Sequence, residues 1–145
     1  MKHILTLQFE SVQGSRNEMF RYCSLISPTH FVQPIENFGH SSIRNLLVHV
    51  ANASLYWLAE YALKKPASYG KADSFYTVEQ IRPLYDQMDL VMKEFLTSFP
   101  ENDKPITGWV KWVKKDLTVT PLQLFTHVVT HMFHHKGQIL SMSRQ

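Results

Sequence analysis

Cysteine is nearly absent from this sequence of 145 residues, which contains only Cys23. A single cysteine excludes an internal disulfide. Because Cys23 lies in an apolar run with helical spacing, we expect a small buried side chain rather than a nucleophile. The lack of a disulfide framework is typical of proteins of the reducing cytoplasm, where we expect this protein to be located.

Long hydrophobic runs are also lacking. No stretch approaches the roughly eighteen uninterrupted apolar residues that a membrane span needs. The apolar run near Ile4 is short and soon meets Glu10, which argues against a secretory signal. The hydrophobic fraction of 44% and the charged fraction of 19% are typical of a soluble globular protein. We therefore expect a single domain over residues 1–145, with no membrane partner.

The excess of positive charge is small, with a formal net charge of +3. The only dense basic cluster is Trp109-Val110-Lys111-Trp112-Val113-Lys114-Lys115. Tryptophans among lysines can contact nucleic acid, but no nucleic-acid recognition fold accompanies this cluster. Because runs of charge usually lie on a solvated surface, we predict a solvated hairpin or helix end and no nucleic-acid partner.

The spacing of apolar residues predicts four amphipathic helices. Their expected bounds are Lys2 to Ile26, Ser41 or Ser42 to Lys64, Thr77 to Phe99, and Thr120 to Ser141. Thr77 and Thr120 each begin a capping box, with Gln80 and Gln123 three positions later. Pro28 ends the first helix, because the residue before a proline is pushed out of the helical region.

The connecting segments predict how the helices are joined. Residues 29–40 are expected to form a loop with room for one turn of helix, and residues 65–74 a linker long enough to cross the end of a bundle. The segment from Ile106 to Thr120 mixes aromatic and β-branched residues with a Lys-Lys-Asp corner, which favours a short hairpin. The predicted fold class is all-α, a four-helix bundle with a short hairpin before the last helix.

The most informative stretch, Thr126 to Gln138, holds four of the protein's eight histidines. On a helix, His131 and His135 share one side and lie at the margin of the apolar arc, so both are aimed toward a bundle interior. Their ring nitrogens can reach one ion at about 2.0–2.1 Å. His127 and His134 point further toward the polar side. Two ligands do not complete a site, so a third must come from another helix.

His49 is the candidate third ligand, because it lies at the margin of the apolar arc of the predicted second helix. A lone histidine in such a place is more often a hydrogen-bonded core residue than a ligand. Histidine pairs at helical spacing are also often ordinary surface residues. A bundle without metal, in which the histidines are structural, therefore stays open as an alternative.

The second ring nitrogen of a metal-bound histidine usually donates its proton to a carboxylate, a carbonyl or water. The histidine-rich helix has few acidic residues, so we expect these partners on other helices or on the backbone. His127 and His134 could hold a bound water or substrate, or could be exposed histidines without a role. We predict that His134 does not ligate the metal.

The Leu-Leu-Val-His-Val segment around His49, Trp57 two turns later, and the histidine-rich helix together resemble the DinB/YfiT-like superfamily of metalloenzymes. The similarity covers the helix order of essentially the whole chain, and the histidine-rich helix is its most specific part. The resemblance implies a metal site formed by His49, His131 and His135, without identifying a catalytic residue. It also implies a homodimer.

Three neutral nitrogen ligands suit zinc, our first expectation, or nickel, our second. The better understood branches of the superfamily are thiol-dependent S-transferases and a thiol-dependent isomerase. The resemblance therefore implies a metal-dependent transferase or hydrolase with a small-molecule substrate and a low-molecular-weight thiol. The alternative is a non-catalytic metal-binding or stress-response module on the same fold.

Overall fold

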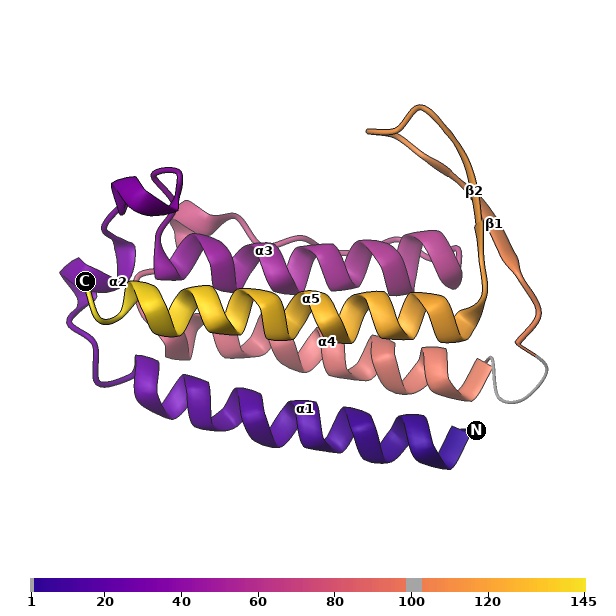
Figure 1. The fold of residues 1–145 in the computed structure, drawn as a ribbon, viewed down its shortest axis with the longest axis horizontal. Helices are drawn as coiled ribbons and strands as arrows, with labels where there is room; N and C mark the ends of the chain where they lie inside the picture. The colour runs from indigo at the N-terminus through magenta and orange to yellow at the C-terminus, as the bar shows by residue number, and fades with distance from the viewer. Residues whose placement is uncertain (1, 99–102) are drawn as a thin grey trace.

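Four long helices form the body of the molecule in a computed structural model that describes residues 2–98 and 103–145 (Figure 1). Their bounds are α1 Lys2–Cys23, α3 Ile43–Leu55, α4 Val78–Ser98 and α5 Pro121–Met142. Helices α3 and α4 run in the same direction and opposite to α1 and α5, so the connection between α3 and α4 crosses the bundle. The predicted all-α bundle is confirmed. None of the helices in these residues is long and apolar enough to span a membrane.

The chain between α1 and α3 contains two short helices, α2 Pro28–Val32 and the 3₁₀ helix η1 Glu36–Phe38. The first helix ends at Cys23, three residues before the predicted end at Ile26. Pro28 does not only end a helix, because it is also the first residue of α2. A proline is well tolerated at that position, where its missing N–H would have no partner. The Ser27 hydroxyl caps α2 by accepting a hydrogen bond from the His30 N–H at 3.2 Å.

The helix starts follow the capping signals in the sequence. The Ser42 hydroxyl accepts a hydrogen bond from the Asn45 N–H at 3.1 Å, which identifies Ser42 as the cap of α3. At α5, the predicted capping box is confirmed: Thr120 Oγ1 accepts from the Gln123 N–H, and Gln123 Oε1 accepts from the Thr120 N–H. These caps set where α3 and α5 begin, and therefore the register of their histidines.

The second predicted helix changes its hydrogen-bond pattern after Leu55. Residues Tyr56–Ala62 form a π-helical segment, η2, and the Leu63 N–H donates to the Leu58 carbonyl at 3.0 Å. Segments of π-helix are rare and are frequent at functional sites. The helical stretch ends next to Lys64, which has a left-handed φ of 56°.

A two-stranded hairpin follows α4, with β1 Ile106–Val110 antiparallel to β2 Lys115–Val119, as predicted. It rises from the end of the bundle next to the end of α3 (Figure 1). The Tyr61 hydroxyl donates to the Leu117 carbonyl at 2.6 Å, and Lys64 Nζ donates to the Thr107 carbonyl at 3.1 Å. These bonds attach the hairpin to the end of the second long helix.

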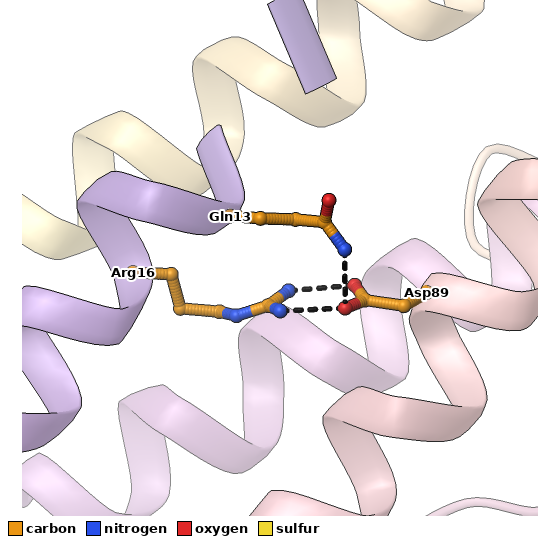
Figure 2. Close-up of polar contacts among 3 residues, drawn as sticks. All are labelled: Gln13, Arg16 and Asp89. Atoms are coloured by element: carbon orange, nitrogen blue, oxygen red, sulfur yellow. Dashed lines mark hydrogen bonds and ion pairs between the residues drawn. The ribbon is translucent and has the colours of Figure 1, made fainter. Parts of the chain in front are cut away.

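A buried ion pair joins α1 to α4 (Figure 2). The Arg16 guanidinium donates two hydrogen bonds to the Asp89 carboxylate, at 2.7 and 2.6 Å, and Gln13 Nε2 donates a third at 2.7 Å. The Arg16 and Asp89 side chains are only 9% and 13% exposed. The rings of Phe20 and Tyr85 also lie against the guanidinium. The guanidinium and the carboxylate form two parallel hydrogen bonds, which require a specific relative orientation. This contact therefore fixes the position of α1 against α4.

Cys23 lies in the core at the end of α1, with only 2% of its surface exposed. Burial raises the pKa of its thiol to about 11. A thiol with such a pKa carries almost no thiolate at neutral pH and is a poor nucleophile. The prediction of a small buried side chain is confirmed.

Candidate metal centre

Three histidines from two helices meet on one side of the bundle. Helix α3 packs against α5, and this contact brings His49 beside His131, although the two are 82 residues apart in the sequence. His135 lies one turn after His131 on α5. One ring nitrogen from each of the three histidines lies within 4.8 Å of the other two. The structure thus brings together the three residues that the sequence suggested as ligands.

His131 is at the centre of this cluster. Its Nε2 lies 3.1 Å from Nε2 of His49 and 3.0 Å from Nε2 of His135. A neutral imidazole nitrogen carries either one proton or one lone pair. The three nitrogens therefore cannot all be satisfied by hydrogen bonds with one another, whereas a cation between them can accept a lone pair from each ring.

The spacing of the nitrogens fits a transition metal. Nitrogen ligands at about 2.0–2.1 Å from a tetrahedral zinc ion lie roughly 3.4 Å apart. The two nitrogen–nitrogen distances to His131, 3.1 and 3.0 Å, are slightly shorter, so small side-chain movements suffice to admit the ion. The set contains only imidazoles, and an all-nitrogen set is compatible with zinc or nickel.

The electrostatics of the cluster favour neutral rings. Burial, followed by the nearby His135 and His49 rings, lowers the pKa of His131 to about 4. Burial also lowers the pKa of His49 and that of His135, although the hydrogen bond between His135 and Gln138 opposes the shift in His135. Only a neutral imidazole binds a metal ion. The cluster is therefore already in its metal-binding protonation state at neutral pH.

His135 finds a partner for its second ring nitrogen on its own helix. Its Nδ1 lies 2.6 Å from Gln138 Oε1. Because a carbonyl oxygen only accepts hydrogen bonds, Nδ1 carries the proton, and the lone pair of Nε2 is directed at the cluster. The expectation that such partners come only from other helices or from the backbone is wrong for His135. Gln138 is three positions further along α5, and side chains at this spacing are neighbours.

Replacing Gln138 by Ala is expected to weaken zinc binding by about 10- to 100-fold, because His135 loses the acceptor that fixes its tautomer. Competition with a chromophoric chelator would measure the affinity of the purified variant. Gln8, exposed on α1, provides the matched control, since Gln8→Ala should leave the affinity unchanged. An unchanged affinity in Gln138→Ala would show that this hydrogen bond does not support metal binding.

His127 and His134 lie next to the cluster but outside it. The His127 ring stacks on that of His131 with centroids 6.1 Å apart, and the His134 ring meets that of His135 edge-on at 4.9 Å. Both side chains are exposed, as expected from their position toward the polar side of the helix. Neither belongs to the group of mutually close ring nitrogens, so both are available to contact water or a substrate.

Aromatic side chains beside the cluster were not part of the predicted site. Trp57, from η2, meets the His127 ring edge-on at 5.3 Å, and Trp112, from the hairpin turn, meets Trp57 at 5.6 Å. From the sequence, Trp57 contributes to the family resemblance without a role at the site, and Trp112 belongs to a basic surface cluster. The contact between them requires the hairpin to fold back onto η2, which no local pattern indicates.

Comparison with known proteins identifies the family of the chain. A sequence model described as the DinB family matches residues 1–145, which is the whole chain. No curated protein matches the chain.

Proposed function

The chain belongs to the DinB family, and from this membership and the histidine cluster we propose that it is a metal-dependent enzyme. His49, His131 and His135 hold one divalent ion, zinc in the first place and nickel in the second. The observation that carries this proposal is the convergence of three ring nitrogens within 4.8 Å of one another.

The exposure of the cluster leaves room for a further ligand. His49 is exposed, and His131 and His135 are half-buried, so solvent can reach the cluster. A zinc site with three protein ligands and an open position is of the catalytic kind, whereas structural sites have four protein ligands. The solvent-facing side of the cluster is therefore where we place the substrate or water.

The proposed reaction is transfer of a thiol, or hydrolysis. A bound ion of this kind acts as a Lewis acid and lowers the pKa of a thiol or water beside it. In thiol transfer, the thiol loses its proton to solvent and its sulfur forms a bond to an electrophilic carbon. The leaving group departs with the electron pair of the bond that breaks. Gln138 keeps the Nε2 lone pair of His135 directed at the site throughout.

The thiol in this proposal is a small molecule rather than a side chain. Cys23 is the only cysteine of the chain, and it is buried at the end of α1 with a raised pKa. A low-molecular-weight thiol is therefore the co-substrate we propose, together with a small electrophilic substrate. A homodimer and a cytoplasmic location are further proposals, drawn from the family resemblance and the composition.

Protein purified without a histidine tag is expected to contain one equivalent of zinc or nickel, measured by elemental analysis. It should also conjugate a small thiol to an electrophile faster than the uncatalysed reaction, with the rate lost on chelation and restored by the ion. A protein that stays metal-free after supplementation with both ions would contradict the metal site. Conjugation that survives chelation would contradict the metal-dependent reaction.

A metal-binding module without turnover is the second candidate, and one observation favours it. One apolar cavity, between α1 and α5, is lined by residues such as Val12, Met19, Met132 and Ile139, and by none of the three clustered histidines. An enzyme usually has a substrate pocket that opens onto its reactive centre. Stoichiometric metal without conjugation or hydrolysis of any tested substrate would support this candidate.

A further inference from the structure

Three aromatic side chains form a connected group at the junction of η2 and the hairpin turn. Tyr56, Trp57 and Trp112 contact one another in all three pairs, with ring centroids 5.2, 4.7 and 5.6 Å apart. Two of the rings come from the π-helical segment and the third from the turn between β1 and β2. We call Tyr56, Trp57 and Trp112 the aromatic wall.

The aromatic wall is continuous with the histidine cluster. Trp57 meets the His127 ring edge-on, with centroids 5.3 Å apart. His127 in turn stacks on His131, the central residue of the cluster, at 6.1 Å. A molecule that reaches the cluster with one end can therefore lie along His127 and the aromatic wall with the other.

The chain positions the aromatic wall with elements that are costly to form. Tyr56 and Trp57 lie in a seven-residue π-helical segment, and such segments are rare and are often found at functional sites. Trp112 is held by a hairpin that Tyr61 and Lys64 attach to this segment by hydrogen bonds. Lys64 and Lys114 have left-handed φ values of 56° and 50°, which residues other than glycine rarely adopt. These hydrogen bonds and backbone conformations therefore determine the position of Trp112.

The outer face of the aromatic wall is open. Trp112 is 60% exposed, and the adjacent Val113 is 42% exposed. An indole that stays exposed to water does not contribute the favourable free energy of burying its large apolar surface. Exposed apolar groups that are clustered beside a site usually mark a binding surface. Lys111 and Lys114 flank Trp112 in the sequence, whereas burial and then the charge of Glu60 raise the pKa of Tyr56. Charges of both signs therefore lie near the aromatic wall, which favours a neutral ring.

We propose that the aromatic wall binds a flat aromatic ring of the substrate while the reactive end of the same molecule reaches the histidine cluster. Trp112 then determines specificity for aromatic over small aliphatic substrates. Aromatic rings pack well edge-to-face or offset against tryptophan, and both arrangements are open to a ring that approaches from the solvent side. This inference rests on the proposed metal site and adds the chemical class of the substrate to it.

Two thiols test this inference through binding rather than turnover. The protein is loaded with Co²⁺, whose absorption changes when a thiolate binds to it, and is titrated with benzyl mercaptan or with 1-propanethiol. Both carry the sulfur, but only benzyl mercaptan carries an aromatic ring. Replacing Trp112 by Ala is expected to weaken benzyl mercaptan binding by about tenfold, the size of one good aromatic contact, and to leave 1-propanethiol binding unchanged.

Two variants serve as controls. Trp109 lies on the same hairpin, is 61% exposed and is not part of the aromatic wall, so Trp109→Ala should bind both thiols as the wild type does. Trp112→Phe retains a ring and should recover most of the lost affinity for benzyl mercaptan. Unchanged binding of 1-propanethiol also shows that each variant is folded and holds the ion.

The outcomes separate this inference from the metal site on which it rests. Failure of Co²⁺ to bind would overturn the proposed function and this inference with it. Binding of Co²⁺ with an equal effect of Trp112→Ala on both thiols, or with no effect, would overturn the inference alone. A change from dimer to monomer in Trp112→Ala, seen by sedimentation, would overturn it too, because a second copy of the chain would then cover the aromatic wall.

Discussion

Replacing His135 by Ala is expected to abolish the binding of one equivalent of zinc, whereas replacing His134 by Ala should weaken it tenfold at most. His135 directs Nε2 toward His131 at 3.0 Å, so the variant loses one of the three proposed ligands. His134 meets the His135 ring edge-on and is not one of the three histidines whose ring nitrogens lie close together. Its loss is therefore expected to cost no more than the lower end of the roughly 10- to 100-fold typical of groups that act through a ligand.

Isothermal titration of both variants with zinc, starting from chelator-treated protein, would measure the two affinities. The pair is well matched, because the two histidines are adjacent on α5 and both changes favour the helix equally. The reverse order of effects would mean that α5 presents a different set of ring nitrogens to the ion. Equal retention of zinc in both variants would argue that the ion binds elsewhere.

Replacing Asp89 by Ala is expected to lower the free energy of unfolding by about 3–5 kcal/mol, because it leaves the Arg16 charge buried without its partner. The Arg16 side chain is only 9% exposed, and the variant removes the carboxylate that accepts two of its hydrogen bonds. Urea denaturation followed by circular dichroism would measure the change. The effect should be independent of metal, because the ion pair joins α1 to α4 and not α3 to α5.

The ion pair of Arg21 and Glu18 provides the control. Its side chains are 79% and 68% exposed, and pairs of this kind contribute about 0–1 kcal/mol. Glu18→Ala should therefore change the stability little. The double variant Arg16→Met, Asp89→Leu should recover much of the loss, because it removes both charges rather than one. A cost in Asp89→Ala no larger than in Glu18→Ala would show that Arg16 reaches water.

The predicted parts of the fold are those that depend on neighbours in the sequence. The capping box at Thr120 and the helical spacing of apolar residues both act within a few residues, and both are confirmed. The mixed aromatic and β-branched composition around Trp109 also predicts the hairpin correctly. For the candidate site, the step of four residues is enough to place His131 and His135 on one side of a helix, because it depends only on the helical repeat.

The remaining parts depend on contacts between distant residues. Arg16 and Asp89 are 73 residues apart, and neither carries a local sign that it has a buried partner. The π-helical segment at Trp57 was not predicted, because apolar residues at helical spacing fit an α-helix and a short π-helix equally well. Gln138 could have been found, since its spacing from His135 already places the two side chains side by side.

The burial of Cys23 decides how thiol chemistry can be followed on this protein. Because the single sulfhydryl of the chain is in the core, with a pKa near 11, a thiolate-specific dye added to the folded protein finds almost nothing to modify. In a reaction mixture, the dye therefore titrates only the small thiol that remains, and its consumption gives the extent of conjugation without a protein background. A slow appearance of one dye-reactive group per chain would instead report that α1 has come away from the bundle.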